Sequence, residues 1–380
     1  MDRDNGGFFG TVHSDLAVDK EAPRSCVVNA RILWTYSAAA RLIDPAYRPV
    51  ADWAFDYVAG KFRDREQDGL FWSLDRQGRP ISDRKQTYAQ AFGIYGLAEH
   101  HRLTSDPASL DLAIRLHALV EQRCHDPVFM GYIEARDRAW RPMADMRLSE
   151  RDLNSPKSMN THLHVLEAYT NLARVWPDAG LLVRLRELLQ VMLDHIVDPS
   201  SGHFRMFFDE RWNSLSPHVS FGHDIEGSWL LTEAAEVLGD PALLVRARST
   251  AMRMAHAVLE QGADEDGSVV FEADGEGRLL DSNKHWWVQA EAVVGFFNAW
   301  QISGDMRFRE ASRRAWDYIE THVVDRQHGE WHAKLSRGGK PLSEAEDPEA
   351  CLAGFWKCPY HNARVCYEML GRLAETETRA

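Results

Sequence analysis

Residues 220–231, SFGHDIEGSWLL, form the stretch from which the fold can be worked out. An apolar helical body begins there, with His223, Asp224 and Glu226 at its start. His223 and Glu226 are three residues apart, so on a helix they share one face. Burying an imidazole and a carboxylate costs free energy unless the two groups are paired or used. Taken alone, the stretch favours a helix cap, because acidic residues belong in the first turn.

The same kind of helix recurs along the chain. Six apolar helices are expected at Arg31–Leu42, Thr87–His101, Met159–Val175, Asp224–Leu238, Trp286–Ile302 and His361–Leu373. Amphipathic helices, polar on one face, are expected between them at Ala46–Phe62, Ser109–Arg123, Gly180–Ile196, Pro241–Gln261 and Asp305–Val323. Segments rich in glycine and aromatic residues are expected to form small hairpins that start at Gly69, Gly131, Gly202, Gly267 and Gly329.

This order of inner helix, outer helix and hairpin predicts an all-α (α/α)6 barrel, with short β-hairpins in the loops at the mouth of the active site. The apolar helices would line the inside, and the amphipathic helices would shield them. Nothing in the chain resembles a linker, so residues 1–380 are expected to form a single catalytic domain. Its folded part is expected at about 26–374, with loose tails at Met1–Ser25 and Glu375–Ala380.

Composition excludes several classes of partner. The net charge of −13 over 380 residues argues against nucleic acid and against anionic membranes. The start of the chain lacks the pattern of a signal peptide, and no stretch approaches 18 uncharged apolar residues. The five cysteines contain no CxxC pair, which fits reduced thiols. We therefore expect a cytoplasmic protein that does not bind membranes.

Polar and aromatic side chains recur at the start of every inner helix, whereas the helix bodies are apolar. In chain order they are Arg31 and Trp34; Tyr88 and Gln90; Asn160, His162 and His164; His223 and Glu226; Trp286, Trp287, Gln289 and Glu291; His361 and Arg364. In a ring, all six helix starts meet at one mouth. Six contributions to one pocket explain this recurrence better than six separate caps, so the pattern favours a functional site.

The types of residue narrow the chemistry. No phosphate-binding glycine motif appears where it would matter, so no nucleotide cofactor is indicated. An HExxH pair is absent, and His162 and His164 are two residues apart and cannot share a helix face, so no metal is expected. Histidine is the side chain best suited to moving a proton at neutral pH. His223 and His361, from opposite sides of the ring, can reach both faces of a planar intermediate.

Proton abstraction next to a carbonyl group produces an enediolate, whose charge Arg31 can offset. Trp286 and Trp356 are suited to stacking against sugar rings. These features favour sugar epimerisation or aldose–ketose isomerisation. One alternative is a glycoside hydrolase, which needs two opposed carboxyl groups; carboxyl groups are available at Asp152, Asp224, Glu226 and Glu291. The other alternative is a carbohydrate-binding barrel without activity.

The sequence resembles the N-acylglucosamine 2-epimerase superfamily, and within it the cellobiose 2-epimerases, from about Arg31 to Glu368. The matching segments are RILWTYSAA, GLFWSLDRQGRP, KQTYAQAFGIYGLAE, PKSMNTHLHVLEAYTNL, FGHDIEGSWLL, WWVQAEAVVGFFNAW and GFWKCPYHNAR. The resemblance implies a barrel that inverts C2 of a reducing-end glucose, giving mannose, without a metal or redox cofactor. The expected partner is therefore a small sugar, and a monomer or homodimer is expected.

The resemblance also implies a role for each matching residue. The acid/base histidines would be His223 and His361, and Glu226 would orient or polarise its histidine. Arg31 would hold the substrate oxygens near C1 and C2. The other residues expected to line the sugar site are Tyr88, Asn160, His164, Glu291, Asp152, Trp286 and Trp356.

The chain departs from the family pattern in three places. Ala40 stands where an aromatic residue is common, and residues 332–334 lack the usual aromatic after Trp331. The segment Ser343–Leu352 is longer and more acidic than expected, and it borders the region where a second sugar unit would lie. The substrate can therefore be a monosaccharide or a disaccharide. The alternative within the superfamily is a mannose 2-epimerase or a mannose isomerase.

Overall fold

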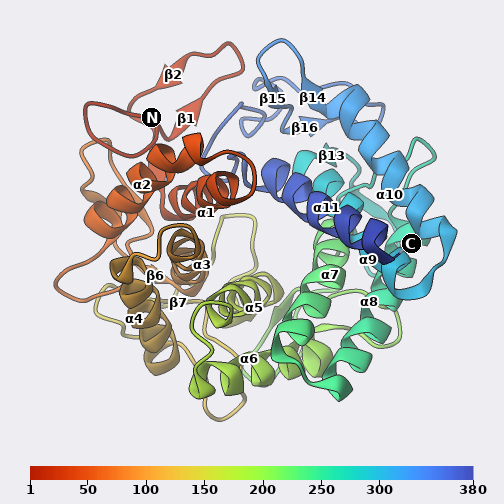
Figure 1. Cartoon of the computed structure of the whole chain (residues 1–380), viewed down its shortest axis with the longest axis horizontal. Coiled ribbons are helices and arrows are strands. Elements are labelled where there is room, and N and C mark those ends of the chain that lie inside the picture. The colour runs from red at the N-terminus through yellow and green to blue at the C-terminus, as the bar shows by residue number, and fades with distance from the viewer. Residues whose placement is uncertain (380) are drawn as a thin grey trace.

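Six α-helices form a closed inner ring in the computed structural model, which describes residues 1–379 (Figure 1). Each inner helix packs against the next, and α11 packs against both α9 and α1. The inner helices are α1 (Cys26–Leu42), α3 (Thr87–Thr104), α5 (Met159–Ala173), α7 (Phe221–Leu238), α9 (Trp286–Ser303) and α11 (Tyr360–Arg379). The (α/α)6 architecture predicted from the sequence is confirmed.

Five outer helices cover this ring, each packed on the inner helix that precedes it. They are α2 (Arg48–Tyr57), α4 (Pro107–Arg123), α6 (Ala179–Val191), α8 (Pro241–Gln261) and α10 (Met306–Tyr318). A 3-10 turn at Pro45–Tyr47 precedes α2, and π-helical turns extend three of the five at Val58–Phe62, Met192–Ile196 and Ile319–Val323. Within residues 1–379, α11 has no outer partner, so the ring has five helix pairs and one single helix.

Aspartates fix the start of the outer helices. The Asp106 carboxylate accepts a hydrogen bond from the Ala108 backbone N–H at 2.9 Å, and Asp240 accepts one from Ala242 at 3.0 Å. Each is followed by a proline, which is favoured in the first helical turn because its missing N–H costs no hydrogen bond there.

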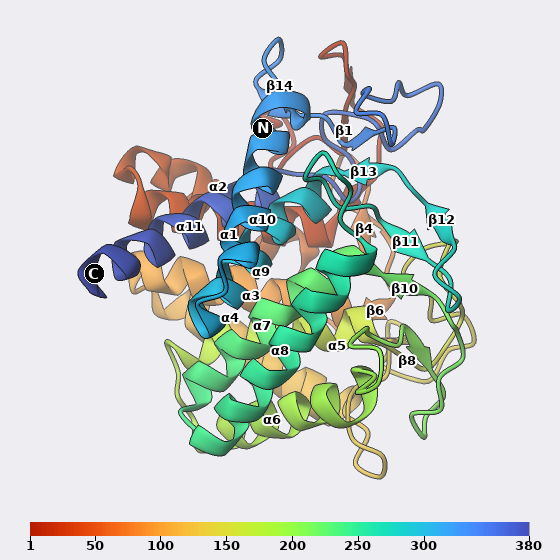
Figure 2. The same cartoon turned by 90° about the vertical axis from the view of Figure 1, so that its right-hand side faces the viewer.

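Short strands gather at one end of the barrel, away from the C-terminus (Figure 2). The strand before an inner helix pairs antiparallel with the strand that follows the next outer helix. These pairs are β3 (Arg24–Ser25) with β4 (Ser73–Leu74), β6 (Lys85–Gln86) with β7 (Ala135–Arg136), β8 (Lys157–Ser158) with β9 (Phe207–Phe208), β10 (Val219–Ser220) with β11 (Glu272–Ala273), and β13 (Lys284–His285) with β16 (Lys334–Leu335). The strand pairing between successive units therefore fixes where α1, α3, α5, α7 and α9 begin.

The expected hairpins are only partly present. In the described chain, two of the five close as paired strands, β4 with β5 (Pro80–Ser82) and β11 with β12 (Leu279–Asp281). Two others close through single bridges, Phe208 to Ser214 and Leu335 to Pro341. One pair lies outside this repeat, β1 (Thr11–Val12) with β2 (Val18–Asp19). The pair β14 (Val324–Asp325) with β15 (Glu330–Trp331) stands where the other units have a single bridge, such as Arg63 to Leu70.

Buried lysines tie the strands that precede three inner helices to the neighbouring turns. Lys85 donates to Asp64 at 3.0 Å, and Lys157 donates to Asp126 at 2.9 Å. Lys284 pairs with Asp264 in the same way. All three lysine side chains are fully buried. A buried ammonium is tolerated only when it is paired and hydrogen-bonded, so each pair fixes one helix start to one turn.

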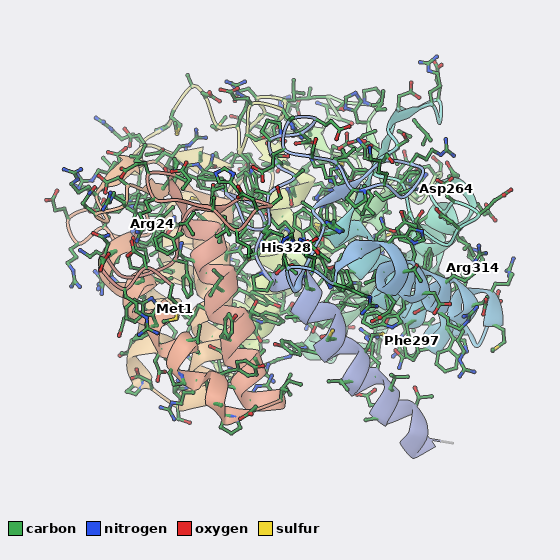
Figure 3. The ribbon with its side chains drawn as sticks, turned by 90° about the horizontal axis from the view of Figure 1, so that it is seen from above. Met1, Arg24, Asp264, Phe297, Arg314 and His328 are labelled. Atoms are coloured by element: carbon green, nitrogen blue, oxygen red, sulfur yellow. The ribbon has the colours of Figure 1, made fainter. Side chains whose placement is uncertain are left out.

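The N-terminal segment Met1–Ser25 is ordered against the barrel, which corrects the prediction of a loose tail. Asp2 and Arg24 form a buried ion pair, and the Trp53 indole N–H donates to the Gly7 carbonyl at 2.9 Å. Val12 also pairs with Ala353 through backbone bonds. In Figure 3, Met1 and Arg24 appear beside the N-terminal helices. Sequence periodicity missed this packing because it depends on one buried ion pair and on partners far along the chain.

At the other end, α11 stays helical through Arg379, whereas residues 375–380 were expected to be loose; Ala380 lies outside the described residues. The last turns of α11 project beyond the other helices (Figures 2 and 3). None of the helices within residues 1–379 is long and apolar enough to cross a membrane.

Candidate active site

A cavity of about 680 Å³ opens at the end of the barrel that carries the strands. This volume lies in the range of sites that enclose small ligands. Ten of the eleven predicted site residues line the cavity; they are Arg31, Tyr88, Asp152, Asn160, His164, His223, Glu226, Trp286, Trp356 and His361. The eleventh, Glu291, lies behind His361 and reaches the cavity through it. The helix starts therefore meet at one mouth, as the sequence predicts.

His361 is held by a carboxylate. Its Nδ1 atom lies 2.8 Å from Oε1 of Glu291, and both side chains are almost fully buried. The other oxygen of Glu291 accepts a bond from the indole N–H of Trp229 at 3.0 Å. A carboxylate keeps the proton on Nδ1, so Nε2 is the ring nitrogen left to exchange a proton with a ligand.

Arg364 joins three buried carboxylates behind His361. Its guanidinium donates to Glu291 at 2.7 Å and also bonds to Glu167 and Glu226. Burial raises the pKa values of Glu226 and Glu291, with the charge of Arg364 opposing this rise. Two carboxylates that share one cation in a dry site hold on to a proton more strongly than exposed ones do.

The same carboxylates belong to the one group of His, Cys, Asp and Glu side chains, within residues 1–379, whose geometry suits a metal ion: Glu226, Glu291 and His361. Arg364 already donates to both carboxylates of this group. The positive charge that this cluster needs is thus supplied by the chain itself.

His223 has a different partner. Its Nδ1 atom lies 2.8 Å from the hydroxyl oxygen of Ser220, and its ring packs on Trp287 with centroids 4.8 Å apart. Burial, together with the nearby charges of His164 and Arg31, lowers the pKa of His223 to about 3. The imidazole is therefore neutral at physiological pH.

The partner expected for His223 was Glu226. The carboxylate of Glu226 instead bonds to Arg364, on the side of the second histidine. The three-residue spacing places His223 and Glu226 on one helix, but Ser220, one residue before α7, is the group that reaches the imidazole ring.

Arg31 lies in the cavity wall without an ion-pair partner in the described chain. One terminal nitrogen donates to the Tyr88 hydroxyl at 3.0 Å, and the other donates to the Trp356 carbonyl at 3.3 Å. His164 lies beside Tyr88 with ring centroids 5.0 Å apart, and its Nδ1 atom is 2.8 Å from Glu167. Since no carboxylate neutralises Arg31 directly, its charge is available to anionic oxygens of a ligand.

Three tryptophans supply apolar walls. Trp287 contacts both catalytic candidates, with ring centroids 4.8 Å from His223 and 5.7 Å from His361. Trp286 and Trp356 also line the cavity. The Trp286 Nε1 and Asn160 Oδ1 atoms are buried without a hydrogen-bond partner in the described chain. Buried polar atoms of this kind are costly unless a ligand or water satisfies them, so they mark where hydroxyl groups of a ligand can bind.

The acidic segment Ser343–Leu352 lies at the rim of the cavity. Lys334 donates to Asp347 at 2.6 Å and to Glu349 at 2.9 Å. Glu349 also pairs with Arg151 at 3.2 Å, from the loop that carries Asp152. The Asp152 carboxylate accepts from the Ser149 backbone N–H at 2.8 Å. An ion pair therefore connects two loops across the outer part of the cavity.

Sequence reasoning gave no role to four residues that organise the site: Ser220, Trp287, Glu167 and Arg364. Trp287 and Arg364 were placed at helix starts, which is the signal that marks them. The sequence signal for Ser220 is its position three residues before His223. Glu167 looks like an ordinary residue of a helix body, and its role depends on Arg364, far along the chain.

Comparisons with known proteins show which family the chain resembles over its length. The model of the family described as N-acylglucosamine 2-epimerase (GlcNAc 2-epimerase) matches residues 7–352. The cellobiose 2-epimerase of Bacteroides fragilis is 45% identical over 372 residues, which cover 98% of this chain and 93% of that protein. The solved structure of cellobiose 2-epimerase from Bacillus thermoamylovorans B4167 matches with a TM-score of 0.91 and 38% identity, covering 98% and 94% of the two chains. The D-mannose isomerase of Marinomonas mediterranea is more distant, at 20% identity over 97% of this chain and 92% of that protein.

Proposed function

Because the chain belongs to the N-acylglucosamine 2-epimerase family, we propose that it inverts C2 of the reducing-end glucose of cellobiose and produces glucosyl-mannose. The observation that carries this proposal is the 45% identity to a cellobiose 2-epimerase over almost the whole of both chains. The cavity supports it, since two histidines with bound Nδ1 atoms line one chamber with an unpaired arginine.

The reaction begins with opening of the sugar ring, which exposes a C1 carbonyl. One histidine then removes the C2 proton through Nε2. The electron pair of the C2–H bond forms the C1–C2 double bond, and the π pair of the carbonyl moves to its oxygen, which leaves a cis-enediolate. Arg31 stabilises the negative oxygens, because its guanidinium is buried and has no carboxylate partner in the described chain.

Rotation about the C2–C3 bond then presents the other face of the intermediate. The second histidine returns a proton from its Nε2 to C2, and the C1 carbonyl re-forms before the ring closes. Trp287, which contacts both imidazoles, and the cluster around Arg364 keep the two rings in place and exclude water.

The proposed catalytic domain is the whole ring, because all six inner helices contribute side chains to the cavity. We further propose a cytoplasmic enzyme, since the five cysteines are free thiols and four of them are buried. A monomer or a homodimer is expected, and sedimentation velocity of the purified protein distinguishes the two.

The test is NMR of the purified protein with cellobiose in D2O. Deuterium at C2 together with a glucosyl-mannose product is the expected result. His223→Ala and His361→Ala are each expected to abolish turnover while thermal unfolding stays cooperative. Conversion of mannose but not of cellobiose moves the assignment to a mannose 2-epimerase, or to a mannose isomerase if fructose forms. Free glucose from cellobiose without exchange at C2 identifies a glycoside hydrolase and overturns the proposal.

A further inference from the structure

Ser220 is bonded differently from the serines that stand in the same place in other repeats. Ser25 and Ser158 also directly precede inner helices, and their hydroxyl oxygens accept bonds from the backbone N–H three residues on, at 3.4 and 3.2 Å. Ser220 makes no such cap. Its hydroxyl lies 2.8 Å from Nδ1 of His223, the side chain three residues on.

This difference has an energetic cost. A serine cap stabilises the start of a helix, and α7 does without it. Ser220 is almost fully buried, and the imidazole is the one hydrogen-bond partner of its hydroxyl in the described chain. The Ser220 hydroxyl thus forms a hydrogen bond with His223, which lines the cavity, and does not cap helix α7.

The two histidines consequently have unequal partners. His361 is bonded to the carboxylate of Glu291, whereas His223 is bonded to a neutral hydroxyl and makes no hydrogen bond to a carboxylate within residues 1–379. A carboxylate stabilises an imidazolium that forms beside it. Burial and the charge of Arg364 lower the pKa of His361, so this ring too is neutral until it takes up a proton during the reaction. A hydroxyl holds the ring and adds no charge.

We propose that Ser220 is the positioning residue of His223: its oxygen accepts a hydrogen bond from Nδ1–H, leaves Nε2 unprotonated towards the sugar, and makes His223 the base of the resting enzyme. His361 is the ring that Glu291 can stabilise once Nε2 has taken up a proton, and it returns this proton to C2. This inference rests on the proposed 2-epimerase function. The protons balance over one turnover. His361 takes up one proton from solvent at Nε2 and gives it to C2, and His223 accepts one proton from C2 at Nε2 and releases it to solvent.

Without the hydroxyl, Nδ1 has no acceptor and the proton of the neutral ring is free to move to Nε2, where it blocks the base. Ser220→Ala is therefore expected to lower kcat roughly 10- to 100-fold, with a smaller change in KM. The equilibrium constant fixes the ratio of kcat/KM in the two directions, so inversion slows equally from both epimers. Exchange of the C2 proton with solvent is not bound by that ratio.

The deciding experiment follows inversion and C2 exchange in D2O, separately from cellobiose and from its C2 epimer. The epimer whose C2–H faces His361 is expected to keep its exchange in Ser220→Ala, because His361 and Glu291 are intact. The epimer facing His223 is expected to lose exchange together with inversion. In His223→Ala, the epimer that still exchanges its C2 proton is the one whose C2–H faces His361. Ser220→Thr keeps the hydroxyl and is expected to show wild-type inversion and wild-type C2 exchange.

Ser25→Ala is the matched control, because it removes an equivalent cap from α1 and leaves both histidines and their partners in place. It is expected to lower the unfolding temperature and to leave exchange from both epimers at the wild-type level. The inference is overturned if Ser220→Ala inverts cellobiose at the wild-type rate, or if exchange from both epimers falls in parallel with inversion. If the wild-type protein does not invert cellobiose at all, the proposed function itself fails.

Discussion

Oε1 of Glu291 accepts hydrogen bonds from two side chains of α11, Nδ1 of His361 at 2.8 Å and the guanidinium of Arg364 at 2.7 Å. One oxygen therefore connects the proton-transfer group to the buried cation. Any change at Glu291 alters the basicity of His361 and the charge balance of the cluster together.

Glu291→Gln is the direct test of this relationship. The amide keeps the shape of the side chain but removes the negative charge that stabilises the imidazolium of His361. We expect kcat for cellobiose to fall about 100-fold, within the range of acid–base effects, with a smaller change in KM. Glu310→Gln, which removes an exposed carboxylate, is the control. Unchanged kcat in Glu291→Gln contradicts a role of the pair in catalysis.

Glu134 is expected to make the free energy of unfolding depend on pH. Its carboxyl group is buried in the cavity wall, where it accepts bonds from the Ser158 backbone N–H and from the Thr161 hydroxyl. Burial raises the pKa of Glu134 from 4.5 to about 7. The folded protein thus binds this proton more tightly than the unfolded chain does, so the free energy of unfolding falls as the pH rises from about 4.5 to about 7.

The expected size of this effect is up to about 3 kcal/mol, from the shift in pKa. Urea unfolding at several pH values measures it. Glu134→Gln has no carboxyl group to titrate and is expected to show a flatter dependence over the same range. The interpretation fails if the two proteins lose stability in parallel as the pH rises.

Lys157 tests the buried ion pairs that fix the helix starts. It donates to Asp126 at 2.9 Å and to the carbonyls of Met130 and Glu210 at 2.7 and 2.8 Å. Lys157→Ala leaves the carboxylate and both carbonyls without this donor. The expected loss of unfolding free energy is about 3 kcal/mol, measured by urea denaturation. Lys340→Ala, at an exposed position, should change it little, and equal losses in the two variants refute a special role for the buried pair.

Removal of metal ions is expected to leave activity unchanged. The carboxylates of Glu226 and Glu291 both receive bonds from Arg364, so the chain itself supplies the cation. The measurement is the rate of C2 exchange after dialysis against a chelator. A loss that is reversed by adding a divalent cation would show that the enzyme needs a metal.

The sequence predicts the ring and most of the cavity because both depend on local signals. Each inner helix has an apolar body and polar residues at its start. This pattern alone predicts that Tyr88, Asn160 and His223 lie at the same end of the barrel. The glycines that open the expected hairpins are explained as well. Gly131, for example, has φ of +75°, which other residues rarely adopt.

The hydrogen-bond partners were harder to predict because they depend on distances across the barrel. Arg364 and Glu167 are 197 residues apart, and no periodicity links them. The sequence predicts that Glu226 bonds to His223 on the same helix face. The carboxylate instead accepts a hydrogen bond from Arg364, because a guanidinium binds a buried carboxylate more strongly than a neutral imidazole does. Proximity in sequence identifies the residues of the site better than it identifies their pairings.

The contact of α11 with both α1 and α9 has a consequence for synthesis of the protein. Arg31 lies on the first inner helix, whereas His361 and Arg364 lie on the last. A nascent chain that has not yet emerged from the ribosome beyond Tyr360 has an open ring, with apolar faces of α1 and α9 uncovered and no second histidine. The ring can therefore close only after α11 has emerged, and until then its apolar faces are exposed to chaperones and to aggregation.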